Sequence, residues 1–193
     1  MMIVKFRSFD ESTAEDWTYL AEKFSAFEQK TVTRVVEALK SLAGHDLGYP
    51  VDRYVHSLQT ATLALRSGAD DETTVCALVH DIGDPMAPNN HGLVAAAMVA
   101  PYVSAENTWM VQNHEAFQAY YYAQHLGGDR FAREAFRGHP AFERTAMFSD
   151  NWDQKAFDPG YDTLPIEAFL PALNAIFRRP VWGEHTRGET AKP

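Results

Sequence analysis

Residues 77–85 read ALVHDIGDP, and this stretch decides both the fold class and the kind of site that the sequence predicts. Small apolar residues lead up to the pair His80–Asp81, and Gly83 and Pro85 follow at once. Glycine and proline end helices, so the pair is expected at a helix terminus. A buried histidine or aspartate is costly unless it has a partner. The two residues therefore either cap the helix together or share a metal ion.

On both sides of this stretch, apolar residues recur at helical spacing, and no segment alternates with the period of a strand. The predicted helices lie within residues 12–42 and 53–68, 69–83, 89–100, 104–128, 140–157 and 165–180. A capping box of Ser12 and Glu15 opens the first. The sequence thus predicts an all-α fold, a single bundle of stacked helices. We expect residues 1–45 to form a helical extension, residues 46–180 the bundle and residues 181–193 a loose tail.

Composition narrows the classes of function. The chain has 193 residues, 46% of them hydrophobic, which is enough for a substantial core. Its formal net charge of −9 and its short basic clusters argue against a nucleic-acid partner. The sequence shows no apolar run of the length of a membrane span and no signal peptide, so we expect a cytoplasmic protein without a membrane partner. The sequence leaves open whether the protein forms a homodimer.

Cys76 is the single cysteine, which excludes an internal disulfide, and its apolar neighbours predict a core position. The aromatic run Tyr120–Tyr122 suits a pocket, the core or a dimer face, and we expect the core.

Four of the eight histidines share one pattern. Each lies in a different predicted helix or at its end, with apolar neighbours at helical spacing: His56, His80, His91 and His114. Hydrogen bonds alone are a poor way to satisfy four interior imidazoles taken from four helices. A bundle core lined by imidazole and carboxylate is instead typical of a metal site. We expect His45, His125 and His185 at the surface or in loops.

Carboxylates complete the predicted site. Neighbours in a helix point about 100° apart, so His80 and Asp81 reach one metal only where the helix ends. A carboxylate has two oxygens and bridges two metals, which makes Asp81 the natural bridge. A later carboxylate is needed as well, and the segment SDNWDQKAFD offers Asp150, Asp153 and Asp158. We choose Asp153, because it lies between Trp152 and the apolar pair Ala156–Phe157.

The ordered set His, His-Asp, His, His, Asp resembles the HD-domain superfamily over about residues 46–175. The added His91 and His114 imply its dinuclear forms. One form is the mixed-valent diiron oxygenases, which include myo-inositol oxygenase and the oxygenases that cleave hydroxylated phosphonates. The other is the HD-GYP cyclic-dinucleotide phosphodiesterases. Here Gly48–Pro50 read GYP but precede the His-Asp pair, where the family element follows it.

The single-domain size, the 23 residues between His56 and His80 and the 22 between His91 and His114 look more like the oxygenases. That resemblance implies one iron held by His56, His80, Asp81 and Asp153. A second iron would be held by His91 and His114, with Asp81 bridging the two. The implied reaction uses O2 to cleave a C–C or C–P bond of a small hydroxylated metabolite.

Two alternatives stay open. One is a metal-dependent phosphohydrolase that acts on a nucleotide or phosphate ester. The other is a helical module without catalytic activity. Ligands of this type also accept Mn, Mg, Zn or Ni.

The resemblance also suggests residues around the metals. Tyr49 is placed to cover an open iron position and is, with Asp81, our candidate catalytic residue. The expected substrate contacts are Arg53, Asp84, Gln118, Arg137 and His139. Asp84 stands where the oxygenases often carry a basic residue, so it would repel a phosphonate or bind a cationic or polyol group. For Arg53 and Arg137, a surface salt bridge is the alternative.

Overall fold

The computed structural model describes residues 3–44 and 46–186. Over these ranges the chain is all-helical and has no strand, which confirms the predicted fold class. Its eight α-helices are α1 (Ala14–Glu28), α2 (Thr31–Lys40), α3 (Arg53–Arg66), α4 (Asp71–Val79), α5 (His91–Val99), α6 (Ala105–Gln118), α7 (Phe142–Asn151) and α8 (Leu170–Phe177). Short 3-10 turns extend several of them, among them Ala119–Tyr121, Asp153–Lys155 and Ile166–Phe169. None of the described helices is both long and apolar enough to cross a bilayer.

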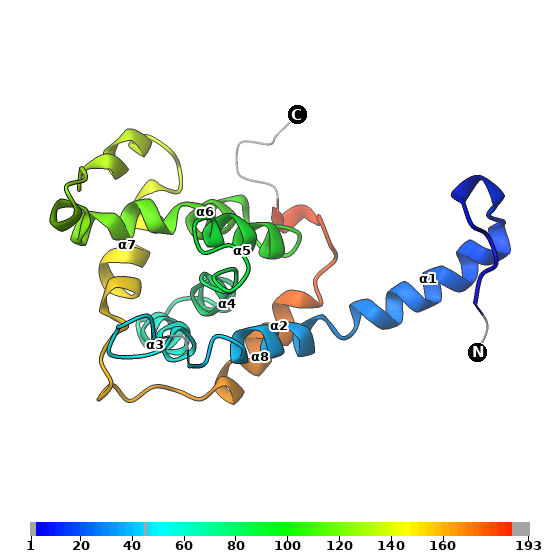
Figure 1. Cartoon of the computed structure of the whole chain (residues 1–193), viewed down its shortest axis with the longest axis horizontal. Coiled ribbons are helices and arrows are strands. Elements are labelled where there is room, and N and C mark those ends of the chain that lie inside the picture. The colour runs from blue at the N-terminus through cyan, green and yellow to red at the C-terminus, as the bar shows by residue number, and fades with distance from the viewer. Residues whose placement is uncertain (1–2, 45, 187–193) are drawn as a thin grey trace.

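Helix α4 is the centre of the body (Figure 1). Every residue from Thr73 to Val79 is buried, including Cys76, as its apolar neighbours predicted. A helix that is buried all round has neighbours on every side. Helices α3 and α8 pack on α4, α6 lies on its other side, and α5 and α7 pack against α6. Four of the predicted metal-binding residues come from α4 and the helices around it.

Helix α1 stands away from this body (Figure 1) and buries none of its residues. Helix α2 differs, because its Val35 and Leu39, and Leu42 just beyond it, are core residues. The sequence assigned residues 1–45 to one extension, whereas the structure packs one face of residues 31–42 against the core. The division between arm and body therefore falls between α1 and α2. His45 and residues 187–193 of the predicted tail lie outside the described residues.

Two local predictions differ from the structure. The box that caps α1 is Thr13 with Asp16, while the Ser12 hydroxyl donates to the Phe9 carbonyl and accepts from the Trp17 indole. The predicted helix over 104–128 ends at Gln118, and the tyrosines that follow form 3-10 turns. The Tyr121 hydroxyl donates to Asp150 of α7 at 2.7 Å, a long-range contact that local periodicity cannot show.

Candidate metal centre

Six buried side chains meet at the end of α4. His56 lies one turn into α3, His80 caps α4, and Asp81 follows in the turn. His91 opens α5, His114 lies in α6, and Asp153 opens the 3-10 turn after α7. None of the six is more than 7% exposed. The structure therefore brings together the predicted ligands, which are spread over about a hundred residues of sequence.

The first cluster contains four donor atoms. The Nε2 atoms of His56 and His80 are 3.2 Å apart, and they lie 3.2 and 3.5 Å from Asp153 Oδ1. Both Nε2 atoms are also 3.5 Å from Asp81 Oδ2. Asp150, the alternative that the sequence offered, instead accepts hydrogen bonds from Tyr121 and Arg133.

The second cluster uses the other oxygen of the same aspartate. His91 Nε2 and His114 Nε2 are 3.2 Å apart and lie 3.1 and 3.3 Å from Asp81 Oδ1. Asp81 thus divides its two oxygens between two pairs of histidines. One further grouping, of His80, His114 and Asp153, reflects how closely the clusters adjoin, since the rings of His80 and His114 are 4.8 Å apart.

These separations fit coordination of metal ions. With metal–ligand bonds of about 2.1 Å, adjacent donors lie about 3.0 Å apart in an octahedron and about 3.4 Å apart in a tetrahedron. The donor separations of 3.1 to 3.5 Å in the two clusters lie within about 0.1 Å of this range. Asp153 Oδ2 is also buried and has no hydrogen-bond partner among the described residues, which leaves a carboxylate oxygen available to an ion.

The far side of each ring fixes which nitrogen faces the cluster. The Nδ1 atoms of His56, His80 and His114 lie 3.0, 2.8 and 2.7 Å from the carbonyl oxygens of Ala156, Ala77 and Val111. A carbonyl only accepts, so each Nδ1 must carry the proton and donate it. His91 Nδ1 makes the same kind of bond to the Pro88 carbonyl at 3.2 Å.

In the neutral rings, the four Nε2 atoms that face the clusters then carry lone pairs. Two unprotonated nitrogens 3.2 Å apart repel each other, so each pair of rings favours a shared cation, which is either a metal ion or a proton. Ring orientation by a bond from the second nitrogen is a general feature of histidines that bind metals.

Burial and mutual attraction set the charges of the site. Burial raises the pKa of Asp81, but the imidazoles of His80, His114 and His91 outweigh it and hold that pKa well below its ordinary value. Asp153 has a lowered pKa as well, because its contacts with His56 and His80 outweigh its burial. Both carboxylates are therefore ionised and suited to bind cations. Burial lowers the pKa of His91, but Asp81 and neighbouring groups raise it to about 9.

The turn after α4 explains how adjacent residues reach one centre. The helix ends at Val79, and the Asp84 amide donates to the Asp81 carbonyl, so Asp81 leaves the helical direction. Gly83 packs tightly against the start of α5. A Cβ at Gly83 would lie 2.7 Å from the His91 carbonyl oxygen and 2.8 Å from Val94 Cβ. Glycine at this position lets the turn approach His91 closely.

Arg53 and Asp84 form a layer next to the ligands. Arg53 Nη1 is 3.3 Å from Asp81 Oδ2, and Arg53 Nε is 2.8 Å from Asp84 Oδ2. Asp84 Oδ1 also lies 3.2 Å from His91 Nδ1. The Arg53 guanidinium is thus neutralised by two carboxylates. These salt bridges are largely buried, whereas the alternative from the sequence was a salt bridge at the surface.

A small cavity of about 130 Å³ lies at this layer. Its lining includes the predicted residues Tyr49, Arg53 and Gln118, and Gln118 Nε2 donates to Asp153 Oδ1 at 2.9 Å. Tyr49 stacks on Phe157, whose ring in turn stacks on His56.

Four further residues line this cavity: Tyr121, Tyr122, Gln154 and Phe157. The sequence singled out neither Gln154 nor Phe157 as a pocket residue, and it gave a pocket as one of three positions for the tyrosine run. The expectation of a core position for the tyrosine run is wrong, because Tyr121 and Tyr122 line this cavity and Tyr122 is 43% exposed. The signal in the sequence for a site near Tyr121 and Tyr122 was their position just after the helix that carries His114.

Two predicted substrate contacts lie elsewhere. Arg137 is exposed and pairs with Glu134 and Glu143, which is the surface salt bridge that the sequence offered as its alternative. His139 stacks on Trp109 with ring centroids 4.1 Å apart, beside a separate aromatic cluster around Phe117. Neither residue lines the cavity at the metal centre. Both follow a glycine-containing loop whose path the local sequence did not fix.

Comparison with known proteins adds no family: no protein-family model matches the chain, and no curated protein matches it either.

Proposed function

We propose that this protein is a dinuclear metalloenzyme, a diiron oxygenase that acts on a small hydroxylated metabolite. The observation that carries the proposal is Asp81, whose two oxygens each face a pair of histidine Nε2 atoms. A bridging carboxylate between two such clusters is the arrangement that two metal ions a few ångströms apart require. The resemblance of the ligand order to the HD-domain oxygenases supports the same function.

The donor set favours iron. His91, His114 and Asp81 offer two imidazoles and one carboxylate, the ligand type of non-haem iron oxygenases with open positions. The other cluster adds Asp153 to two imidazoles and the same bridge. A bound iron pair supplies Lewis acidity and the redox equivalents that activate O2. The chain's own residues fix the ring orientations and keep both carboxylates ionised.

The cavity favours a small substrate. Ligand pockets for drug-sized molecules are roughly 300–1,000 Å³, and this one is about 130 Å³. A volume of this size accommodates a metabolite of a few carbons. Gln118, Gln154 and the tyrosine hydroxyls offer hydrogen bonds to such a molecule. Because Arg53 is paired with two aspartates, the described lining offers a phosphate group no unpaired side-chain cation, so a phosphate would have to bind the metal ions themselves.

The first experiment is metal content and EPR of protein purified without oxygen. We expect two irons per chain and a coupled mixed-valent signal after partial oxidation. His80→Ala should lose metal because it removes a donor from the first cluster, while His125→Ala, an exposed histidine outside the clusters, should keep both ions. If His80→Ala keeps full metal content, the ligand assignment is wrong.

The second experiment separates the two chemistries. Iron-loaded protein should consume O2 with a panel of small polyols and hydroxylated amines. Release of phosphate from small esters with Mn or Mg, without any need for oxygen, would instead establish the phosphohydrolase and overturn the oxygenase.

A further inference from the structure

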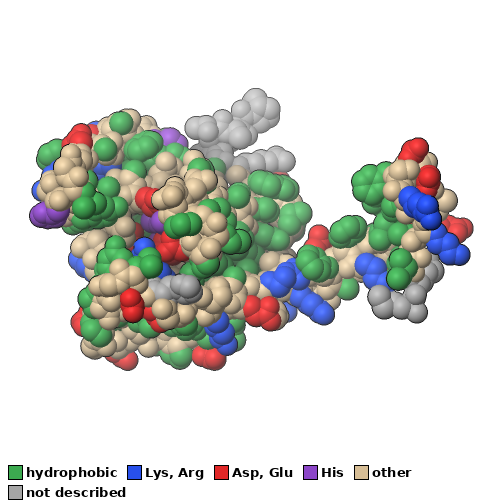
Figure 2. Space-filling model, in the orientation of Figure 1, with side chains coloured by type: hydrophobic (Ala, Val, Ile, Leu, Met, Phe, Trp, Pro, Cys, Tyr) green, Lys and Arg blue, Asp and Glu red, His purple; other side chains and the backbone are tan. Residues whose placement is uncertain are grey.

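Helix α1 stands clear of the body (Figure 1), and apolar side chains are exposed along it (Figure 2). Trp17, Phe24 and Phe27 are 44%, 58% and 61% exposed. Together with Leu20 they recur at intervals of three, four and three residues. This is the a and d spacing of a two-stranded coiled coil. We call these four residues the α1 seam. Its pattern is typical of a helix that packs against a second helix.

The apolar surface continues beyond the start of α1. Residues 3–13, the N-terminal hook, fold back so that Phe6 and Phe9 lie 6.4 and 5.6 Å from the Trp17 ring. Ile3 and Phe9 in the hook are themselves 71% and 74% exposed. The hook therefore extends the seam at its far end.

The exposed area suits a dimer. A large aromatic side chain buries roughly 150–250 Å², so the seam and the hook leave on the order of 600 Å² of apolar surface in water. The largest apolar patch on a typical monomer is about 300–600 Å², and a standard interface covers about 800 Å² on each partner. This surface is at the upper limit for a monomer and approaches what each chain of a stable dimer buries.

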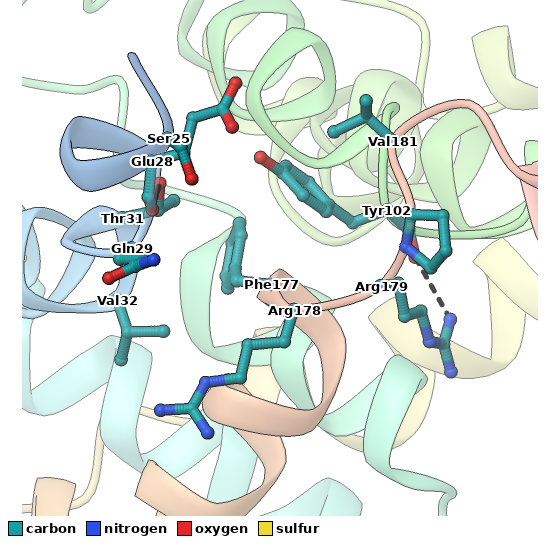
Figure 3. A pocket seen from close by; sticks show the side chains of 11 residues that line it. Ser25, Glu28, Gln29, Thr31, Val32, Tyr102, Phe177, Arg178, Arg179 and Val181 are labelled. Atoms are coloured by element: carbon teal, nitrogen blue, oxygen red, sulfur yellow. Dashed lines mark hydrogen bonds between the residues drawn. The ribbon is translucent and has the colours of Figure 1, made fainter. Parts of the chain in front are cut away.

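A groove lies at the opposite end of α1, where the helix joins the body (Figure 3). It encloses about 580 Å³ between Glu28 and Val32 on one side and Tyr102, Phe177 and Val181 on the other. Its lining is mixed: apolar side chains such as Phe177 and Val181 lie beside polar and charged ones such as Arg178. The groove begins just where the seam ends.

We propose that a second copy of this chain occupies both surfaces: two α1 helices pack antiparallel, and each hook lies on the other copy's groove. Packed helices lie about 8–10 Å apart. A parallel pair would therefore force two much wider bodies together at one end. In the antiparallel pair, Trp17 of one copy lies opposite Phe27 of the other, and Leu20 opposite Phe24. Residue 14 of one copy then lies beside residue 30 of the other, so the hook begins at the groove.

Analytical ultracentrifugation of the full chain tests the proposal. The wild type should sediment as a dimer at micromolar concentration. Phe24→Asp should raise the dimer dissociation constant about 30-fold or more, as loss of a buried anchor does. The matched control is Ala26→Asp, which adds the same charge to the same exposed helix away from the seam. Circular dichroism should show both variants folded.

Distances between spin labels test the orientation. Glu15→Cys and Glu22→Cys lie one heptad apart on the same face of α1, and Cys76 is buried and does not compete for label. Residue 22 is level with the expected two-fold axis, so the axial separation of the Glu15 labels should exceed that of the Glu22 labels by about 20 Å.

Equal distances at both positions would overturn the antiparallel pair. A wild type that sediments as a single chain would overturn the dimer, and so would equal weakening of the dimer by Ala26→Asp and Phe24→Asp. Binding of the single chain to lipid vesicles, lost in Phe24→Asp, would assign the seam to a membrane surface instead.

Discussion

Each imidazole of the two clusters is held by a backbone carbonyl, and the two carboxylates are held by neighbouring side chains. Gln118 donates to Asp153 Oδ1 at 2.9 Å, and Arg53 lies 3.3 Å from Asp81 Oδ2. Groups in this second layer orient the ligands, and their loss commonly lowers metal affinity without removing a ligand. The layer can therefore be tested separately from the ligands themselves.

Gln118→Leu should weaken metal binding about 10- to 100-fold, because Asp153 loses the donor that orients it. Competitive titration against a chelator measures the affinity. Gln154→Leu is the matched control: it makes the same change in the same cavity, but the Gln154 side chain donates to the Asp150 carbonyl and not to a carboxylate of the clusters. Equal affinities in the two variants would show that Gln118 does not position Asp153.

At the scale of elements, Glu72 ties the start of α4 to two neighbouring segments. It accepts hydrogen bonds from the Ser104 amide at 2.7 Å and from Asn107 Nδ2 at 2.8 Å, and it pairs with Arg179 after α8. Burial raises the pKa of Glu72, but the bonds from Ser104, Arg179 and Asn107 outweigh it, so the pKa lies below its ordinary value of 4.5. This junction holds α4 and α6, and with them His80 and His114.

Because folding lowers the pKa of Glu72, the direction in which its contribution to stability changes with pH is defined. The contribution of Glu72 to stability is complete above pH 4.5, the ordinary value, and is lost as the pH falls through the lower folded value. Glu72→Gln should lower the free energy of unfolding at pH 7 by about 1–3 kcal/mol, since a charge-assisted bond is lost. It should also flatten the fall in stability below pH 4.5.

Urea unfolding at several pH values measures both effects. Glu22→Gln, on the exposed arm, serves as control and should change neither. If the stability of Glu72→Gln falls below pH 4.5 as steeply as that of the wild type, Glu72 is not the group that causes this fall.

At the scale of the whole molecule, the chain divides into a body and an arm. Helix α2 inserts Val35 and Leu39 into the core, whereas α1 buries nothing. The candidate metal centre lies in the body, between helices α3 to α7. In our two proposals, the arm contributes to assembly and the body carries the chemistry.

Removal of residues 1–29 should leave the body folded with two metal ions, and its thermal midpoint should shift by only a few degrees. Removal of residues 1–44 should abolish folding, because it takes Val35, Leu39 and Leu42 out of the core. Each such side chain contributes about 1.5–3 kcal/mol, and a typical domain has only about 5–15 kcal/mol in total. Circular dichroism and metal analysis decide this. A body that stays folded without residues 1–44 would instead support the boundary that the sequence suggested.

The sequence by itself determined the all-helical class, most helix starts and the histidines of the candidate site. The reason is that helical periodicity and caps are local, and four histidines with apolar neighbours on separate helices indicate a shared interior. His56, His80, His91 and His114 could all be placed on inward faces in this way.

Only the tertiary structure decided the rest. The roles of Asp150 and Asp153 depend on whether each side chain faces Tyr121 or the histidines. The proton on each Nδ1 depends on a carbonyl that, for His56, lies 100 residues away. The cavity lining after α6 and the membership of α2 in the core arise from packing between distant segments. Such contacts produce no periodic pattern in the local sequence. Whether a side chain is buried depends on which distant segments the fold packs against it.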